Sequence, residues 1–187
     1  LIIIGIGVAL LMNLYMPSVD KDLHKLQKQI ENNFKMILKE MSNYLRDSDN
    51  MWDGKELTET HDLLQKANIT ALRNIENHFL RYDDYYYHYF KMRERQFEIL
   101  ERILPFVSSL DQTVHQGIKM AEFLDELSKA ISPLNRATYF LDELAIMRIE
   151  FQQMELPQTR QEFEIRSSLF YLMHELEQYL LIKSSLK

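Results

Sequence analysis

The chain has 187 residues, of which 46% are hydrophobic, and this share suffices to bury one core or two small ones. Four glycines are too few for the turns of an all-β fold or a nucleotide-binding α/β fold, and the absence of cysteine excludes disulfides, thiolate metal sites and cysteine nucleophiles. The net charge of −6 disfavours a general nucleic-acid-binding protein, which needs a basic face.

An uncharged apolar run, LIIIGIGVALLMNLYM, occupies residues 1–16. As a helix it would reach about 24 Å, which is shorter than the hydrocarbon core of a bilayer, and the chain starts at Leu1. We interpret the run as the end of a truncated transmembrane helix. Lys21, Lys25 and Lys28 follow it, so the positive-inside rule predicts that residues 18–187 lie on the cytoplasmic side of the cell membrane.

Two other interpretations of residues 1–16 compete with a membrane helix. A signal peptide would need a basic start and a small-residue cleavage site, and neither is visible. A run of this length can also be a buried core helix. In that case the chain would be a freestanding soluble helical-bundle adaptor, and membrane partitioning of the intact gene product would distinguish it from a transporter domain.

Two helices are expected in the first eighty residues, where helix-forming residue types dominate. Ser18 can cap the first, which runs to about Arg46. Its apolar residues recur every three or four positions and form one stripe: Leu23, Leu26, Ile30, Phe34, Ile37, Met41 and Leu45. The sequence Asp53-Gly54-Lys55-Glu56 predicts a capping box at the start of the second helix.

The rest of the chain predicts three or four more helices. One spans residues 82–110 unless Pro105 kinks or ends it. Thr113 can cap the next, and Ser132-Pro133 favours a cap followed by proline at the first helical position. A capping box at residues 159–162 opens the last helix. Short polar links between long helices predict an all-α fold, an elongated antiparallel bundle of about five to six helices.

Two stretches of the sequence suggest a family. One is Gly5-Ile6-Gly7-Val8-Ala9-Leu10-Leu11-Met12-Asn13-Leu14 followed by Met16-Pro17, and the other is YFKMRERQFEILERI at residues 89–103. Together they resemble the putative aromatic acid exporter family of bacteria, in which a membrane-spanning half precedes a helical cytoplasmic domain. The resemblance implies that the chain is the C-terminal part of such a protein, with a regulatory, ligand-sensing or assembly role. The translocation path would lie in the missing transmembrane half, so no transport residue can be assigned.

Tyrosines gather on one face of the helix predicted at residues 82–110. Tyr82, Tyr85, Tyr86 and Tyr89 fall within an arc of about 100°, and Arg93 lies near its middle. Aromatic residues at helical spacing usually pack in a core. Alternatively, Arg93 with Tyr82, Tyr86 and Tyr89 could hold a small aromatic carboxylate, because guanidinium binds carboxylate bidentately and aromatic walls hold a ring.

Three charged residues interrupt predicted apolar stripes: Arg93, Arg148 and Glu177. A charge on an apolar stripe must find a partner or remain in water. We therefore predict that Glu177 pairs with one or both arginines inside the bundle.

Motifs for catalysis and for cofactors are missing from the sequence, which has no Gly-x-Ser-x-Gly, P-loop or dinucleotide fingerprint. The Glu-x-x-His pair of di-metal helical bundles is also missing, and Asp84 with His88 supplies only two potential ligands. We therefore expect no catalytic residue, metal or cofactor. The long amphipathic helices favour a homo-oligomer without fixing its size.

Overall fold

The computed structural model describes residues 19–47, 51–77, 84–108, 110, 114–134 and 136–186. In these ranges the chain forms α2 (Val19–Arg46), α3 (Lys55–Asn77), α4 (Tyr85–Ser108), α5 (His115–Lys129), α6 (Ala137–Gln153) and α7 (Arg160–Ser184). The predicted all-α fold is confirmed. Residues 1–16 lie outside the described part, within which no helix is both long and apolar enough to cross a membrane.

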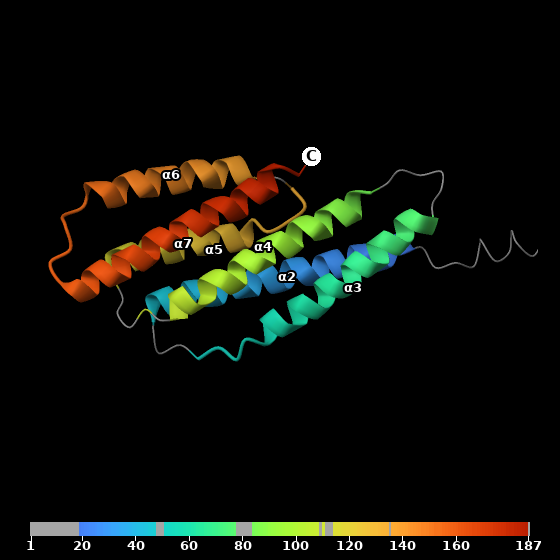
Figure 1. Cartoon of the computed structure of the whole chain (residues 1–187), viewed down its shortest axis with the longest axis horizontal. Helices are drawn as coiled ribbons and strands as arrows, with labels where there is room; N and C mark the ends of the chain where they lie inside the picture. Colours follow the sequence, from blue (N-terminus) through green and yellow to red (C-terminus); the bar gives the residue numbers. More distant parts are fainter. Residues whose placement is uncertain are drawn as a thin grey trace, which may run out of the picture.

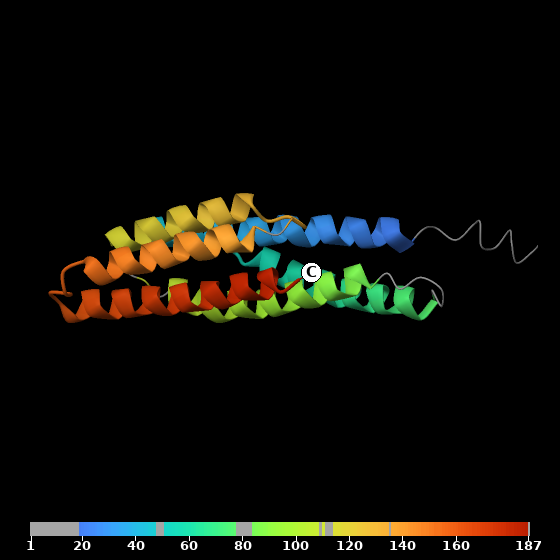
Figure 2. The same cartoon turned by 90° about the horizontal axis from the view of Figure 1, so that it is seen from above.

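The six described helices form an elongated bundle, which Figure 1 shows along its length. α2 packs most extensively against α5 and α3, α4 packs against α7 and α3, and α6 packs against α7. Figure 2 shows α2 and α5 along one long side, and α4 and α7 along the opposite side. Helices that pack most closely run in opposite directions, as the short connections predict.

Packing of a single stripe holds α2 in place. All seven apolar residues predicted for this stripe are buried, with exposed fractions of 5% or less. Full burial of one such side chain stabilises a fold by roughly 1.5–3 kcal/mol. The helix is therefore fixed mainly by its contacts with α3, α4 and α5, and less by intrinsic helix propensity.

Of the two predicted capping boxes, the one at the start of α7 is complete in the structure. Thr159 accepts a hydrogen bond from the backbone N–H of Glu162 at 3.1 Å, and the Glu162 carboxylate accepts one from the N–H of Gln158 at 2.8 Å. These bonds satisfy backbone donors that the first turn of α7 leaves without partners. At the start of α3, Asp53 accepts a bond from the N–H of Lys55 at 3.1 Å, but the Glu56 carboxylate accepts one from the Trp52 ring N–H, so the predicted reciprocal pair does not form there.

The predicted start of α6 was wrong by four residues. Ser132-Pro133 does not open the helix, which begins at Ala137. The carbonyl oxygens of Ser132 and Pro133 accept hydrogen bonds from Lys183, and Arg93 also donates to the Ser132 carbonyl. Because these two carbonyl oxygens bind side chains of α4 and α7, residues 132–133 form a turn and do not begin the helix.

Two further expectations concern the ends of α4 and α5. α4 contains Pro105 and continues to Ser108, so the proline does not end it immediately. α5 begins at His115 after Val114, which makes no side-chain capping bond. Thr113, the predicted cap, lies outside the described residues.

Candidate functional site

Arg93 lies in the middle of α4 with only 1% of its surface exposed. Its Nε donates to the Tyr89 hydroxyl at 3.0 Å, its Nη1 donates to Gln96 Oε1 at 3.0 Å, and its Nη2 donates to the Ser132 carbonyl at 3.2 Å. Its Cζ is 5.1 Å from the centre of the Phe34 ring. Hydrogen bonds and aromatic faces therefore replace the water that this cation has lost.

The partners of Arg93 extend this polar network to other helices. The Tyr89 hydroxyl donates to Glu31 Oε1 on α2 at 2.6 Å, and Gln96 donates to the Tyr179 carbonyl on α7 at 2.9 Å. We call the buried side chains of this network, together with the neighbouring lysine of α7, the Arg93 cluster: Glu31, Tyr89, Arg93, Gln96 and Lys183. The cluster joins α2, α4, α7 and the turn between α5 and α6.

Burial shifts the pKa of several groups at this site. It raises the pKa of Tyr89 well above its ordinary value, and it raises that of Tyr179 to about 12, in both cases against the opposing effect of the Arg93 charge. Burial lowers the pKa of Lys183 to about 8, and the nearby Arg93 lowers it further while Glu31 opposes the shift. The site therefore favours uncharged tyrosines and weakens the proton affinity of this lysine.

A small cavity lies beside Arg93, between α4, α7 and the α5–α6 turn. Its volume is about 30 Å³, and its polar lining includes Ser132, Tyr179 and Lys183. The Tyr179 hydroxyl is buried and has no hydrogen-bond partner in the described structure. A space of this size holds a water molecule, whereas small-molecule pockets measure about 300–1,000 Å³. An aromatic ring does not fit there.

Of the four residues predicted to hold an aromatic carboxylate, the structure describes Arg93, Tyr86 and Tyr89, and it gives Tyr86 and Tyr89 different neighbours. Tyr89 belongs to the Arg93 cluster, while Tyr86 stacks on Phe90 with ring centres 5.9 Å apart. Tyr82 lies outside the described residues. Carboxylate binding through Arg93, Tyr82, Tyr86 and Tyr89 stays a prediction, and the cavity beside Arg93 in the described part of the chain is too small for the ring.

Glu177 pairs with Arg148 on α6, and the two charged groups are 2.8 Å apart. The predicted pairing of Glu177 with an arginine is therefore confirmed for Arg148. Each side chain is about one-third exposed, so the pair lies near the surface, whereas we expected it inside the bundle. The physical reason is that α6 packs on the outer side of α7, so the stripe of α6 that contains Arg148 is only partly buried. Arg93 obtains its hydrogen bonds from other partners.

Two charged members of the Arg93 cluster, Glu31 and Lys183, were missed by the sequence analysis. Both occupy apolar stripes at helical spacing, which is the signal that singled out Arg93. Glu31 lies three residues before Phe34 on α2, and Lys183 lies four residues after Tyr179 on α7. Their exposed fractions are 9% and 7%.

A larger pocket, of about 460 Å³, lies where α6 turns into α7. Its walls are mainly apolar and include Phe151, Phe163 and Phe170. Arg166 also lines it, but this cation already binds the Glu162 carboxylate and the Glu155 carbonyl. A carboxylate ligand would have to compete with Glu162, so the pocket favours apolar contact over anion binding.

Within the described part of the chain, no group of three histidine, aspartate or glutamate side chains could hold a metal ion. Asp84 and His88 are 2.9 Å apart, and both are well exposed to solvent.

Comparisons with known proteins connect this fold to membrane proteins. Residues 20–184 match the family described as putative aromatic acid exporter C-terminal domain. The uncharacterized protein YqjA of Bacillus subtilis (strain 168) is 55% identical over 187 residues, which are 100% of this chain and 58% of that protein. The chain thus spans little more than half the length of this relative. The crystal structure of a putative membrane protein from Clostridium difficile 630 has a similar fold, with a TM-score of 0.74, 24% identity, and coverage of 87% of this chain and 96% of that one.

Proposed function

The chain belongs to the family of putative aromatic acid exporter C-terminal domains, and from this membership we propose that it is the cytoplasmic domain of a membrane transport protein. Its proposed role is regulation or assembly of the transporter, and not catalysis of its own. The greater length of the Bacillus subtilis relative supports the proposal, since a transmembrane half would supply the translocation path.

The closed Arg93 cluster is the observation that favours an assembly or regulatory role over ligand sensing. It joins α2, α4, α7 and the α5–α6 turn through directional hydrogen bonds. A satisfied buried polar network rigidifies a protein and specifies one arrangement of its helices. A rigid bundle can hold subunits together or transmit a movement of α2, whereas a cavity of about 30 Å³ cannot admit an aromatic acid.

The proposed partners are the membrane, reached through residues 1–16, and the transmembrane half of the same protein. A second copy of the chain is a further proposed partner. Its support is α6, where Tyr139, Ile146 and Ile149 each expose more than half of their surface. Large apolar side chains that are exposed on one face of a helix are often found where another protein binds.

A fractionation experiment tests the proposed location. The intact gene product, tagged at its C-terminus, is expected in the membrane fraction of bacterial cells. Protease added to intact cells should leave the tag uncleaved, and protease added to inverted vesicles should remove it. Recovery of the intact product in the soluble fraction would instead support a freestanding helical adaptor.

A transport assay tests the proposed activity of the whole protein. Cells lacking the gene are supplied with the intact protein or with a version that ends at residue 18 of this numbering, and efflux of a labelled benzoate is measured. We expect efflux with the intact protein and reduced or unregulated efflux with the shortened version, at equal membrane amounts. Equal efflux from cells with and without the gene would argue against the exporter function for this acid class.

A further inference from the structure

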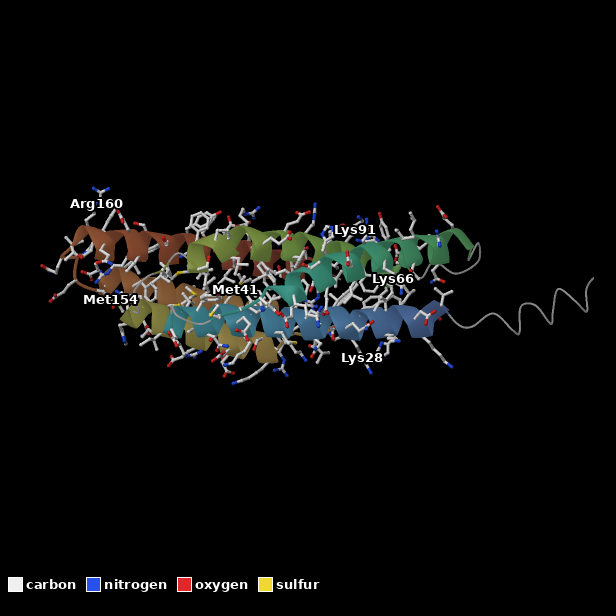
Figure 3. All side chains as sticks on the ribbon, turned by 90° about the horizontal axis from the view of Figure 1, so that it is seen from below. Lys28, Met41, Lys66, Lys91, Met154 and Arg160 are labelled. Carbon is white, nitrogen blue, oxygen red and sulfur yellow. The ribbon has the colours of Figure 1, made fainter. Side chains whose placement is uncertain are left out.

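Four lysines follow one side of α2 and form what we call the lysine stripe: Lys21, Lys25, Lys28 and Lys35. All four are exposed. At 100° per residue they occupy an arc of about 80°, and they extend over roughly 21 Å of the helix axis. Figure 3 shows Lys28 on the outer edge of α2, pointing away from the other helices.

The lysine stripe has no ion-pair partner among the residues that the structure describes. Several other cations of the bundle are paired: Lys39, next along α2, is 2.9 Å from Asp125, and Lys119 and Lys129 pair with glutamates. Acids are not scarce, since the chain has 28 acidic and 22 basic residues. The stripe is thus a local positive surface on an acidic protein.

We propose that the lysine stripe binds the anionic headgroups of a phospholipid membrane, so that the bundle lies with the long side of α2 along the membrane surface. This inference rests on the proposed function, in which residues 1–16 bring α2 next to a bilayer. Each lysine close to an anionic bilayer strengthens binding by roughly fivefold, and four along one arc act together.

Two observations favour a membrane over another polyanion. The stripe begins five residues after the apolar run of residues 1–16, so it would be held close to the headgroups. It also borders a groove of about 620 Å³ between α2 and α3, in which Lys21, Lys25 and Lys28 are joined by His24. A nucleic acid would face a chain whose overall net charge is −6.

The orientation of the bundle makes the proposal specific. If α2 stood upright on the membrane, Lys21 and Lys25 would reach the headgroups, but Lys35 would be about 20 Å further away. Screening at physiological salt acts over about 8 Å, so this distant lysine would contribute little. If α2 lies along the surface, all four lysines contribute similarly.

The test is sedimentation of the full chain with vesicles of phosphatidylcholine alone or mixed 7:3 with phosphatidylglycerol. Variants change a near pair (Lys21→Gln with Lys25→Gln), a far pair (Lys28→Gln with Lys35→Gln), or a control pair outside the stripe. The control is Lys119→Gln with Lys129→Gln, which alters the net charge equally. Circular dichroism verifies that each variant keeps its helix content.

We expect the unchanged chain to bind the anionic vesicles at least tenfold more tightly than the neutral ones, and less so at high salt. The near and far pairs should each lose roughly tenfold or more of the affinity for anionic vesicles, since two lysines are removed. The control pair should stay within about twofold of the unchanged chain, because long-range charge effects are screened.

Three outcomes would overturn the inference. Loss with the near pair but not with the far pair would mean that α2 stands upright. Equal binding to both vesicles, with no change in either pair variant, would show that the lysine stripe does not bind headgroups. Attachment through residues 1–16 would remain possible in that case. Binding to neither vesicle would show that the lysine stripe does not bind headgroups. The proposed function is tested separately, and it would fail if the intact gene product were soluble in cells.

Discussion

The centre of the bundle buries charged side chains, whereas the end at which α6 turns into α7 exposes apolar ones. At the centre, Arg93 is 1% exposed and Lys183 is 7% exposed. At the α6–α7 end, Leu156 is 83% exposed and Phe163 is 59% exposed. Both regions depart from the usual pattern of apolar interior and polar surface, in opposite directions.

The difference shows that the two regions perform different tasks. Hydrogen bonds are directional, so the Arg93 cluster can fix how α2, α4 and α7 lie relative to one another. Apolar contact is not directional, so the α6–α7 end can adapt to whatever covers it. We therefore expect substitutions at the centre to change stability strongly, and substitutions at the α6–α7 end to change it weakly.

The largest effect is expected from Arg93→Ala. Removing the cation leaves the buried Glu31 with Lys183 as its remaining cationic neighbour in the cluster, and it removes the Arg93 donors to Gln96 and Ser132. Breaking a buried charged network in this way destabilises a protein by about 3–5 kcal/mol. Urea unfolding followed by circular dichroism measures the free energy of unfolding. A loss below about 1 kcal/mol would show that water replaces the guanidinium without difficulty.

The titration of Lys183 should make the stability of the protein depend on pH. Its pKa is lowered from 10.5 to about 8 in the folded chain, so between these values the unfolded chain binds more protons. The free energy of unfolding should therefore rise with pH over this window, by roughly 1–3 kcal/mol. Tyr179, with a pKa raised to about 12, acts oppositely above pH 10. Urea unfolding from pH 7 to 11 should show a maximum near pH 10.

Lys183→Met is the matched control for this pH profile, because methionine has a similar length and no charge. The variant should lose the rise above pH 8 and keep the fall above pH 10. An unchanged rise would mean that another group titrates in this window.

A smaller loss is expected from Thr159→Ala, at the start of α7. The change removes the acceptor for the backbone N–H of Glu162. Loss of a helix cap destabilises a protein by about 1 kcal/mol. Thermal unfolding measures the effect, and Thr159→Ser should restore most of it because the hydroxyl is retained.

A still smaller effect is expected from Glu177→Gln, which breaks the surface pair with Arg148. Each partner is about one-third exposed, and such pairs contribute about 0.2–1 kcal/mol. The effect should shrink further in 1 M NaCl, because salt screens exposed charges. A loss close to that of Arg93→Ala would contradict the distinction between surface and centre.

The smallest effect is expected from Phe163→Ser at the α6–α7 end. The ring is 59% exposed, so the free energy of unfolding should change by no more than about 0.5 kcal/mol. The same substitution should weaken self-association if a second copy covers this end, which analytical ultracentrifugation measures. A large loss of stability would show that the exposed ring supports the fold by itself.

Local patterns in the sequence predicted most of the fold. The stripe of α2 and the capping box of α7 depend on residues that are close in sequence, and the structure confirms them. The start of α6 depends on distant residues, because Lys183 on α7 holds the carbonyls of Ser132 and Pro133. No local pattern contains that information.

The centre of the candidate site could be predicted, but its contacts could not. The sequence singled out Arg93 because it is a cation on an otherwise apolar stripe. Its network reaches Glu31, Ser132 and Tyr179, which lie far from α4 in the sequence. Glu177 was predicted to pair with Arg93, Arg148 or both, and it pairs with Arg148 alone among these, because the packing of α6 on α7 places both side chains near the surface.

The packing of α2 has a consequence for synthesis of the protein on the ribosome. Its main contacts are with α3 and with α5, and α5 ends at Lys129, about 80 residues after the end of α2. At typical translation rates these residues take roughly 4–16 s to appear. The apolar stripe of α2 therefore remains partly uncovered for several seconds in every nascent chain, and chaperones can bind it during this interval.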